Sequence, residues 1–190
     1  GSKSTISDLR DFKAAGWDDD LRRHVRRGGR VIGVCGGYQM LGRVVRDPLG
    51  IEGSVVEAEG LGLLDVETDM APEKTVRNSE AWSMEYDVPL TGYEIHLGVT
   101  HGGDCDRPFI RIHGRPDGAV SADRRVAGSY LHGLFASDAF RARLLADFGI
   151  TSSRQDYRAS VDAALDEVAA ELESVLDPAW LDRLLGGNGA

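Results

Sequence analysis

The chain has few cysteines and a deficit of basic residues, so the sequence lacks the usual features of secreted proteins and of nucleic-acid-binding proteins. Its two cysteines, Cys35 and Cys105, are too few for a disulfide framework, and neither belongs to a C-x-x-C pair. No secretory signal and no apolar run of membrane-spanning length is present. Lys and Arg number 22 against 31 Asp and Glu, and the formal net charge of −9 argues against nucleic acid as the partner. We therefore expect a single cytoplasmic domain, 1–190, with no nucleic-acid or membrane partner.

Motifs for bound nucleotides and metals are also missing. The sequence contains no G-x-G-x-x-G, and no Lys-Ser/Thr pair follows Gly37 to complete a phosphate loop. It has neither H-E-x-x-H nor paired cysteines for zinc. We expect no metal site and no cofactor within these residues. The chain begins at Gly1 rather than Met, and its first five residues have the character of a loop that leads into a helix, so we expect a fragment of a longer protein.

Periodicity and turn residues indicate short buried strands between amphipathic helices. This pattern predicts an α/β fold with an open, mostly parallel sheet flanked by helices. We expect helices over 8–15, 18–27, 38–45, 138–148 and 157–176, with a short last helix after Asp177. Strands are expected over 31–34, 63–68, 74–83, 93–98 and 126–131, and a hairpin should pair 109–112 with 118–121 around Pro116–Gly118. The remaining expectations are a glycine-rich loop over 53–62, a turn over 89–92 and a disordered tail over 186–190.

The most informative stretch is the turn that carries Cys35. A β-branched run, 31–34, ends at this cysteine, and Gly33 and Gly37 flank it in the spacing of a nucleophile elbow. A thiol at a helix N-terminus is expected to have a lowered pKa, and the N–H of Gly36 can face a developing oxyanion. A buried structural cysteine at a glycine-rich turn is the alternative. We favour a catalytic nucleophile.

A second strand, 126–131, ends at His132. Strands of one α/β sheet present their carboxyl ends at the same edge, so we expect His132 to meet Cys35 as its general base and acid. His96, His101 and His113 compete for this role. No acidic residue stands two positions after His132, and Glu94 and Asp138 are near only in sequence, so the residue that orients the imidazole is left open.

Three segments together resemble a known family: 35–42 (CGGYQMLG), 92–98 (GYEIHLG) and 128–135 (GSYLHGLF). In this order they are similar to the glutaminase domain of cobyric acid synthases, and the similarity extends over essentially the whole chain. The resemblance implies a class I glutamine amidotransferase fold, flavodoxin-like, in a branch without the His-x-Glu acid. It also implies that the first strand, first helix and second strand of that fold lie outside these residues, which would form a C-terminal part of a longer synthase.

The resemblance also implies a role for each matching residue. Cys35 would form the glutamyl thioester, and His132 would act as base and acid. The N–H of Gly36 would bind the oxyanion, with the Gly1 loop as the second donor. Less direct roles fall to Gln39, which would help to hold glutamine, and to Tyr93 and His96, which would line the pocket.

The partners implied are glutamine and an ATP-dependent synthetase domain, normally in the same chain, that binds ATP, Mg²⁺ and the corrinoid substrate. Ammonia would serve to amidate carboxylates b, d, e and g of adenosylcobyrinic acid a,c-diamide. Alternatives are the glutaminase subunit of lipid II isoglutaminyl synthase, which usually has Asn at the position of Ile95, a cysteine peptidase or other hydrolase, and a non-catalytic domain that docks a synthetase. Without its expected neighbours the chain should be poorly stable or weakly active alone.

Overall fold

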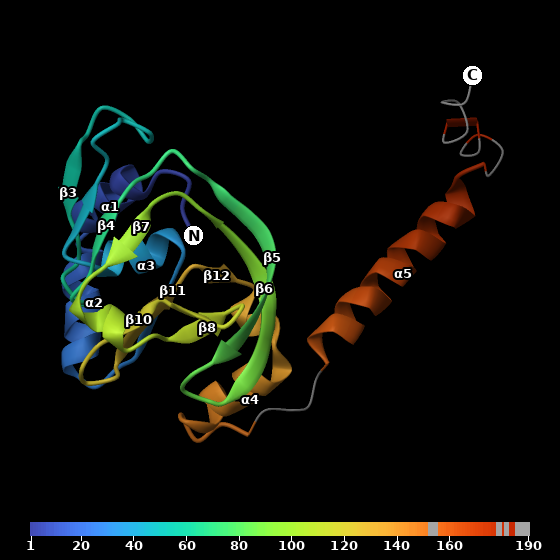
Figure 1. Ribbon diagram of the computed structural model, residues 1–190. Helices are drawn as coiled ribbons and strands as arrows, with labels where there is room; N and C mark the ends of the chain where they lie inside the picture. The colour runs from blue at the N-terminus through green and yellow to red at the C-terminus, as the bar shows by residue number, and fades with distance from the viewer. Residues whose placement is uncertain (152–155, 178–179, 181–182, 185–190) are drawn as a thin grey trace.

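The computed structural model describes residues 1–151, 156–177, 180 and 183–184, and shows a mixed α/β body from which one long helix projects (Figure 1). The helices are α1 Thr5–Ala14, α2 Trp17–Arg26, α3 Gly36–Leu41, α4 Asp138–Ala146 and α5 Tyr157–Val175, with the 3₁₀ turns η1 Gly103–Asp106 and η2 Leu134–Ala136. The strands are β1 Val31–Val34, β2 Val44–Arg46, β3 Glu57–Glu59, β4 Glu67–Asp69, β5 Thr75–Ser83, β6 Val88–His96, β7 Val99–His101, β8 Ile110–Ile112, β9 Arg115–Asp117, β10 Ala119–Val120, β11 Val126–Ser129 and β12 Leu131–His132.

A small sheet, in the order β1-β11-β10, lies beneath the predicted site. β1 and β11 are parallel, and the register pairs Val34 with Ser129, so both strands end at the same level. Every residue of β11 is buried. The chain continues from β1 into Cys35, whose backbone N–H donates to the carbonyl of Ser129 at 2.8 Å. The predicted meeting of these two strand ends is therefore confirmed.

The other two sheets have the orders β12-β6-β5-β8-β9 and β3-β2-β4-β7. Of the nine strand pairs in the described residues, only β1–β11 and β2–β4 are parallel. The expectation of a mostly parallel sheet was therefore wrong. Strands that are joined by short turns pair antiparallel, whereas parallel pairs need long crossovers, and several connections here are short. The flavodoxin-like topology and the elements expected outside these residues stay predictions.

Several predicted boundaries differ from the structure because tertiary contacts reassign them. The helix after Cys35 ends at Leu41, and β2 follows at once. The predicted turn over 89–92 lies inside β6. There Gly92 is required by the neighbouring strand: a Cβ on it would lie 1.9 Å from the carbonyl oxygen of His132. The hairpin turn is at His113 and Gly114, both with positive φ, and pairs β8 with β9 rather than with residues 118–121.

Other expectations are confirmed. β5 spans Thr75–Ser83 and α5 spans Tyr157–Val175, close to the predicted limits. Ser137 caps α4, because its hydroxyl accepts the N–H of Phe140. The strand predicted over 63–68 forms later, as β4, and the loop predicted over 53–62 contains the short β3. The helix expected after Asp177 and the tail 186–190 fall largely or wholly outside the described residues.

Two of the three buried apolar clusters contain most of the buried side chains of the body. One joins β6, β8 and α4 through residues such as Leu90, Ile110 and Phe140. The other packs α1 and α3 against β11 through Leu9, Leu41 and other side chains. None of the described helices has both the length and the apolar character needed to cross a bilayer.

Candidate active site

The backbone at Cys35 has the strained geometry of a nucleophile elbow. Its φ of 56° and ψ of −117° place a non-glycine residue in a region that side chains rarely adopt. Gly33 is required there: a Cβ on it would lie 2.5 Å from Leu41 Cδ1 and 2.8 Å from the Gly37 carbonyl. Gly37 itself faces open space, since an added Cβ would meet no atom within 4 Å. Of the two predicted elbow glycines, packing therefore requires a glycine at position 33 but not at position 37.

The sulfur of Cys35 lies in a largely buried position. The residue is 6% exposed, and Sγ donates to the carbonyl oxygen of Ile95 at 3.4 Å. Burial raises the pKa of the thiol, while backbone N–H groups of Gly36 and Ser2 act against that rise. The expectation of a lowered pKa was wrong, because desolvation outweighs the hydrogen bonds that the turn supplies.

His132 reaches the same carbonyl from the opposite strand. In β12 it pairs with Tyr93, whose ring stacks on the imidazole at a centroid distance of 4.8 Å and an interplanar angle of 5°. Burial lowers the pKa of His132, and a hydrogen bond with the Ile95 backbone opposes this shift. Its Nε2 atom is buried without a hydrogen-bond partner among the described residues.

The N-terminal loop closes over both side chains. A Cβ on Gly1 would lie 3.0 Å from His132 Cε1 and 3.7 Å from Cys35 Cβ. On the next residue, a Cβ on Gly36 would come within 3.0 Å of the Ser2 backbone nitrogen. Figure 1 shows the N-terminus entering the body beside α3 and β12. The structure thus brings Cys35, His132, Gly36 and the Gly1 loop together.

Sequence reasoning missed two contributors to this arrangement. The second N–H directed at the sulfur belongs to Ser2 rather than to Gly1. The carbonyl of Ile95 is shared by the thiol and the imidazole. Backbone groups leave no residue-type signal, and only the motif that surrounds Ile95 pointed to this part of the chain.

Gln39 is committed to contacts within the protein. Its side-chain amide donates to the Leu97 carbonyl at 2.9 Å and to the Tyr130 hydroxyl at 3.2 Å, and it accepts from Thr5 Oγ1 at 3.0 Å. The residue is 3% exposed. These bonds join α1, α3 and the ends of β6 and β11. The structure supports a cross-linking role, and the contact with glutamine stays a prediction.

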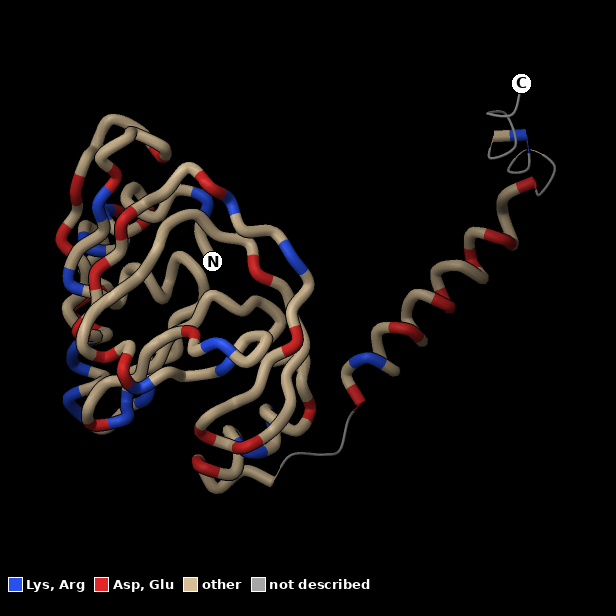
Figure 2. The backbone as a smooth tube through the Cα atoms, viewed as in Figure 1, with Lys and Arg blue, Asp and Glu red and all other residues tan. Residues whose placement is uncertain are grey.

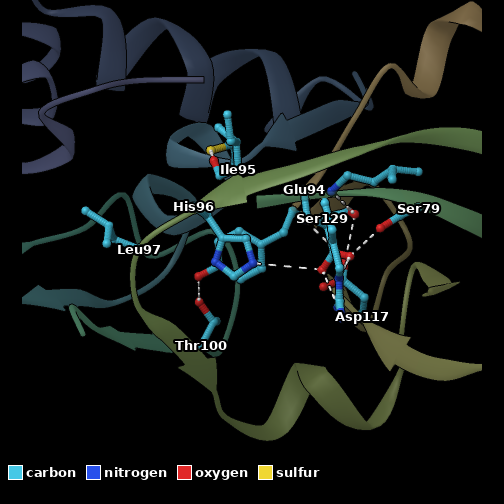
Figure 3. Close-up of polar contacts among 12 residues, drawn as sticks. Ser79, Glu94, Ile95, His96, Leu97, Thr100, Asp117 and Ser129 are labelled. Atoms are coloured by element: carbon cyan, nitrogen blue, oxygen red, sulfur yellow. Dashed lines mark hydrogen bonds and ion pairs between the residues drawn. The ribbon is translucent and has the colours of Figure 1, made fainter. Parts of the chain in front are cut away.

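His96 and Glu94 face away from the Cys35–His132 pair. Figure 3 shows Ile95 on one side of its strand and His96 with Asp117 on the other. The His96 ring stacks on Tyr130 at 3.8 Å, and burial lowers its pKa although Glu94 opposes this. Burial disfavours the Glu94 carboxylate, but hydrogen bonds from Arg77 and Ser79 outweigh it and lower its pKa.

Neither acid considered from the sequence orients His132. Glu94 is held by Arg77, and Asp138 pairs with Arg141 at the start of α4. The neighbours of the imidazole are instead the stacked ring of Tyr93 and the Ile95 backbone. Within the described residues, no cluster of three or more His, Cys, Asp or Glu could hold a metal ion.

Neither of two small cavities in the body is lined by Cys35 or His132. One, of about 240 Å³, is lined by Arg77, Glu94, His96 and Asp117 on the far side of β6. The other, of about 230 Å³, lies beside the start of α1 and carries Glu52 and Arg10 on its wall. Burial is the largest cause of the raised pKa of the Cys35 thiol, and the charge of Glu52 adds to it.

Known proteins are similar to this chain over most of its length. The model of the CobB/CobQ-like glutamine amidotransferase domain matches residues 1–140. The chain is 73% identical to cobyric acid synthase of Rhizobium rhizogenes K84 over 186 residues, which is 98% of the chain. Over the same length it is 72% identical to the cobyric acid synthase of Sinorhizobium fredii NGR234 and 70% identical to that of Rhizobium meliloti 1021. In each case the chain spans 38% of the relative's length.

Proposed function

Because the chain belongs to the CobB/CobQ-like glutamine amidotransferase family, we propose that it hydrolyses glutamine at Cys35 and supplies the ammonia to an ATP-dependent synthetase. The observation that carries the proposal is the convergence of the Cys35 sulfur and the His132 ring on the Ile95 carbonyl, with two backbone N–H groups facing the sulfur. A nucleophile, a base and oxyanion donors in one buried site are the parts that acyl transfer requires.

The pKa directions describe the resting state. A raised thiol pKa and a lowered imidazole pKa leave both groups neutral near pH 7. His132 takes the thiol proton as Cys35 Sγ attacks the side-chain carboxamide carbon, and the N–H groups of Gly36 and Ser2 stabilise the oxyanion. The C–N bond breaks, and His132 returns the proton to the leaving ammonia. Water, deprotonated by His132, then cleaves the thioester to release glutamate and restore the thiol.

The amino-acid end of glutamine requires opposite charges near the nucleophile. Glu52 and Arg10 line the cavity beside α1, and the carboxylate of Glu52 also accepts the N–H of Ile6 at 3.2 Å. We assign Glu52 to the ammonium group and Arg10 to the carboxylate of the substrate. Tyr93 is 45% exposed and stacks on His132, and it lines a separate cavity of about 700 Å³ together with Gly92 and Gly133.

The names of the relatives support a wider activity for the complete protein. They are cobyric acid synthases, and most of their length lies outside the match. We assign that remaining part the binding of ATP, Mg²⁺ and a corrinoid, and the amidation of carboxylates b, d, e and g of adenosylcobyrinic acid a,c-diamide. The assembled Cys35–His132 pair favours this enzyme over a non-catalytic docking domain. Ile95, where the lipid II glutaminase usually has Asn, favours a corrinoid over lipid II.

Glutamine hydrolysis by the complete protein tests the assignment. Cys35→Ser and His132→Asn should each reduce glutamate release at least about a thousandfold, since one removes the nucleophile and the other the proton carrier. Amidation with ammonium chloride should continue. The matched control is Cys105→Ser, which alters the other cysteine, hydrogen-bonded to Tyr38, and should retain hydrolysis. Glutamate release within tenfold of the parent in Cys35→Ser would refute the proposal.

Substrate choice separates the alternatives. Amidation of adenosylcobyrinic acid a,c-diamide but not of lipid II is expected. Cys35 should be labelled by a glutamine-analogue electrophile and not by peptide electrophiles, and the reverse pattern would identify a peptidase.

A further inference from the structure

Helix α5 carries an apolar stripe that stays exposed among the described residues. The stripe, here called the α5 seam, is 38–69% exposed and consists of Val161, Leu165, Val168, Leu172 and Val175. No residue of α5 is buried. In Figure 1 the helix projects from the body, and the described contacts of its first turn are the Tyr157 N–H with Asp138 and the Tyr157 ring beneath Arg141.

The spacing of the seam identifies the kind of surface that fits it. Its residues recur at alternating intervals of four and three, the a/d pattern of a narrow coiled-coil face. A helix that packs broadly on a globular core has a wider apolar face. Most of the stability of a helix in a protein comes from tertiary packing of its amphipathic face, so a covered seam would stabilise α5. We expect an elongated groove between partner helices.

Charge decides among the possible occupants. One basic residue, Arg158, and five acidic residues give α5 a net charge of −4, from Asp162, Asp166, Glu167, Glu171 and Glu173. Figure 2 shows the acidic positions in red along the whole helix. Two copies packed seam to seam would bring these charges together. An anionic membrane would repel them, because interfacial helices carry Lys and Arg beside the apolar face.

We propose that the α5 seam docks into an apolar groove flanked by Lys and Arg on the part of the polypeptide that the relatives carry beyond the matched region. Most of the length of these relatives lies outside the match, so a large surface in the same chain is available. The inference rests on the proposed function only in identifying that part as the synthetase. The first turn of α5 contacts Asp138 and Arg141 of α4, and α4 follows His132 after the short η2. A partner docked on α5 would therefore lie close to the glutaminase site.

Amide hydrogen exchange in the complete protein tests the docking. Leu165→Asp with Leu172→Asp should accelerate exchange across residues 157–175 at least about tenfold, because two charges enter the groove. Ala163→Asp with Ala170→Asp is the matched control: it adds the same charges to the same helix on the face opposite the seam, and exchange there should stay within about threefold of the parent.

Activity gives a second readout. The seam variant should reduce amidation with glutamine at least about tenfold, while glutamine hydrolysis and amidation with ammonium chloride stay within about twofold. Failure of the glutaminase assignment would appear as hydrolysis that survives Cys35→Ser, whatever the exchange result, so the two proposals fail separately.

Three outcomes would overturn the docking proposal. Exchange in α5 of the parent as fast as in the seam variant would show that the seam is uncovered. A parent dimer that becomes a monomer in the seam variant during sedimentation would make a second copy the occupant. Flotation of the parent, but not of the seam variant, with phosphatidylglycerol vesicles would indicate a membrane.

Discussion

At the scale of single residues, the candidate site depends on groups that are kept neutral. Cys35 is nearly enclosed, so its thiolate loses more in hydration than the N–H groups of Gly36 and Ser2 return. The imidazole of His132 is subject to the same penalty. Proton transfer is then needed when glutamine arrives, and a resting thiolate–imidazolium pair is disfavoured.

The pH dependence of alkylation reports this resting state. The rate at which iodoacetamide alkylates Cys35 should be low at pH 7 and should increase about tenfold per pH unit. Because only the thiolate reacts and the pKa of this thiol is raised, the increase should continue past the ordinary pKa of a thiol. Mass spectrometry of the Cys35 peptide measures the rate, with Cys35→Ser defining the contribution of Cys105. A rate that is already constant between pH 6 and 8 would show a preformed thiolate.

Gln39 provides a second test at this scale. Gln39→Met keeps a similar volume but leaves the buried Leu97 carbonyl, Thr5 hydroxyl and Tyr130 hydroxyl without this partner. The free energy of unfolding in urea should fall by about 2–4 kcal/mol. Met40→Leu, at the next position, should cost less than about 1.5 kcal/mol. Unchanged stability with a raised KM for glutamine would instead support the role that the resemblance implies.

At the scale of elements, the elbow and β6 position the chemistry. β1 ends level with β11, and the tight approach of α3 to β1 forces Cys35 into its unusual backbone geometry. β6 then supplies one carbonyl to both reactive side chains, while its next residues, His96 and Leu97, are held by Tyr130 and Gln39. A shift of one residue in the register of β6 would point Tyr93 away from His132.

The two elbow glycines should respond differently to an added methyl group. Gly33→Ala places it against Leu41 and the Gly37 backbone, and should cost about 1–3 kcal/mol in unfolding free energy and at least about tenfold in glutamine hydrolysis. Gly37→Ala meets no neighbour within 4 Å and should be neutral or stabilise by up to about 1 kcal/mol. Urea unfolding and glutamate release measure both effects. Equal damage at the two positions would contradict this account of the elbow.

At the scale of the whole molecule, the body and α5 are energetically separate. The apolar clusters use residues up to Leu144, whereas α5 has no buried residue. The family match, 1–140, covers the same body. Stability of the described structure therefore resides in the body, and α5 is available for a partner.

Truncation measures this separation. A chain that ends at residue 150 should unfold in urea within about 1 kcal/mol of the parent, because the described contacts that it loses, those of Tyr157 with Asp138 and Arg141, are exposed. Circular dichroism should show the loss of helix without a shift of the urea midpoint. A loss above about 2 kcal/mol would mean that α5 packs on the body.

The sequence by itself determined the features that arise from neighbouring residues. The β-branched run before Cys35, the glycine at position 33 and the Ser137 cap are local signals, and each occurs where it was predicted. Local residue types set backbone geometry within a few positions, so these features needed no knowledge of distant segments. The single strand predicted over 126–131 is instead divided into β11 and β12, which belong to different sheets.

Only the tertiary structure decided what depends on burial and on strand register. The antiparallel sheet, the shared Ile95 carbonyl, the N–H of Ser2 and the cross-linking amide of Gln39 all join segments far apart in the chain. The raised pKa of Cys35 has the same origin, because desolvation comes from the residues that surround the thiol rather than from those beside it in sequence.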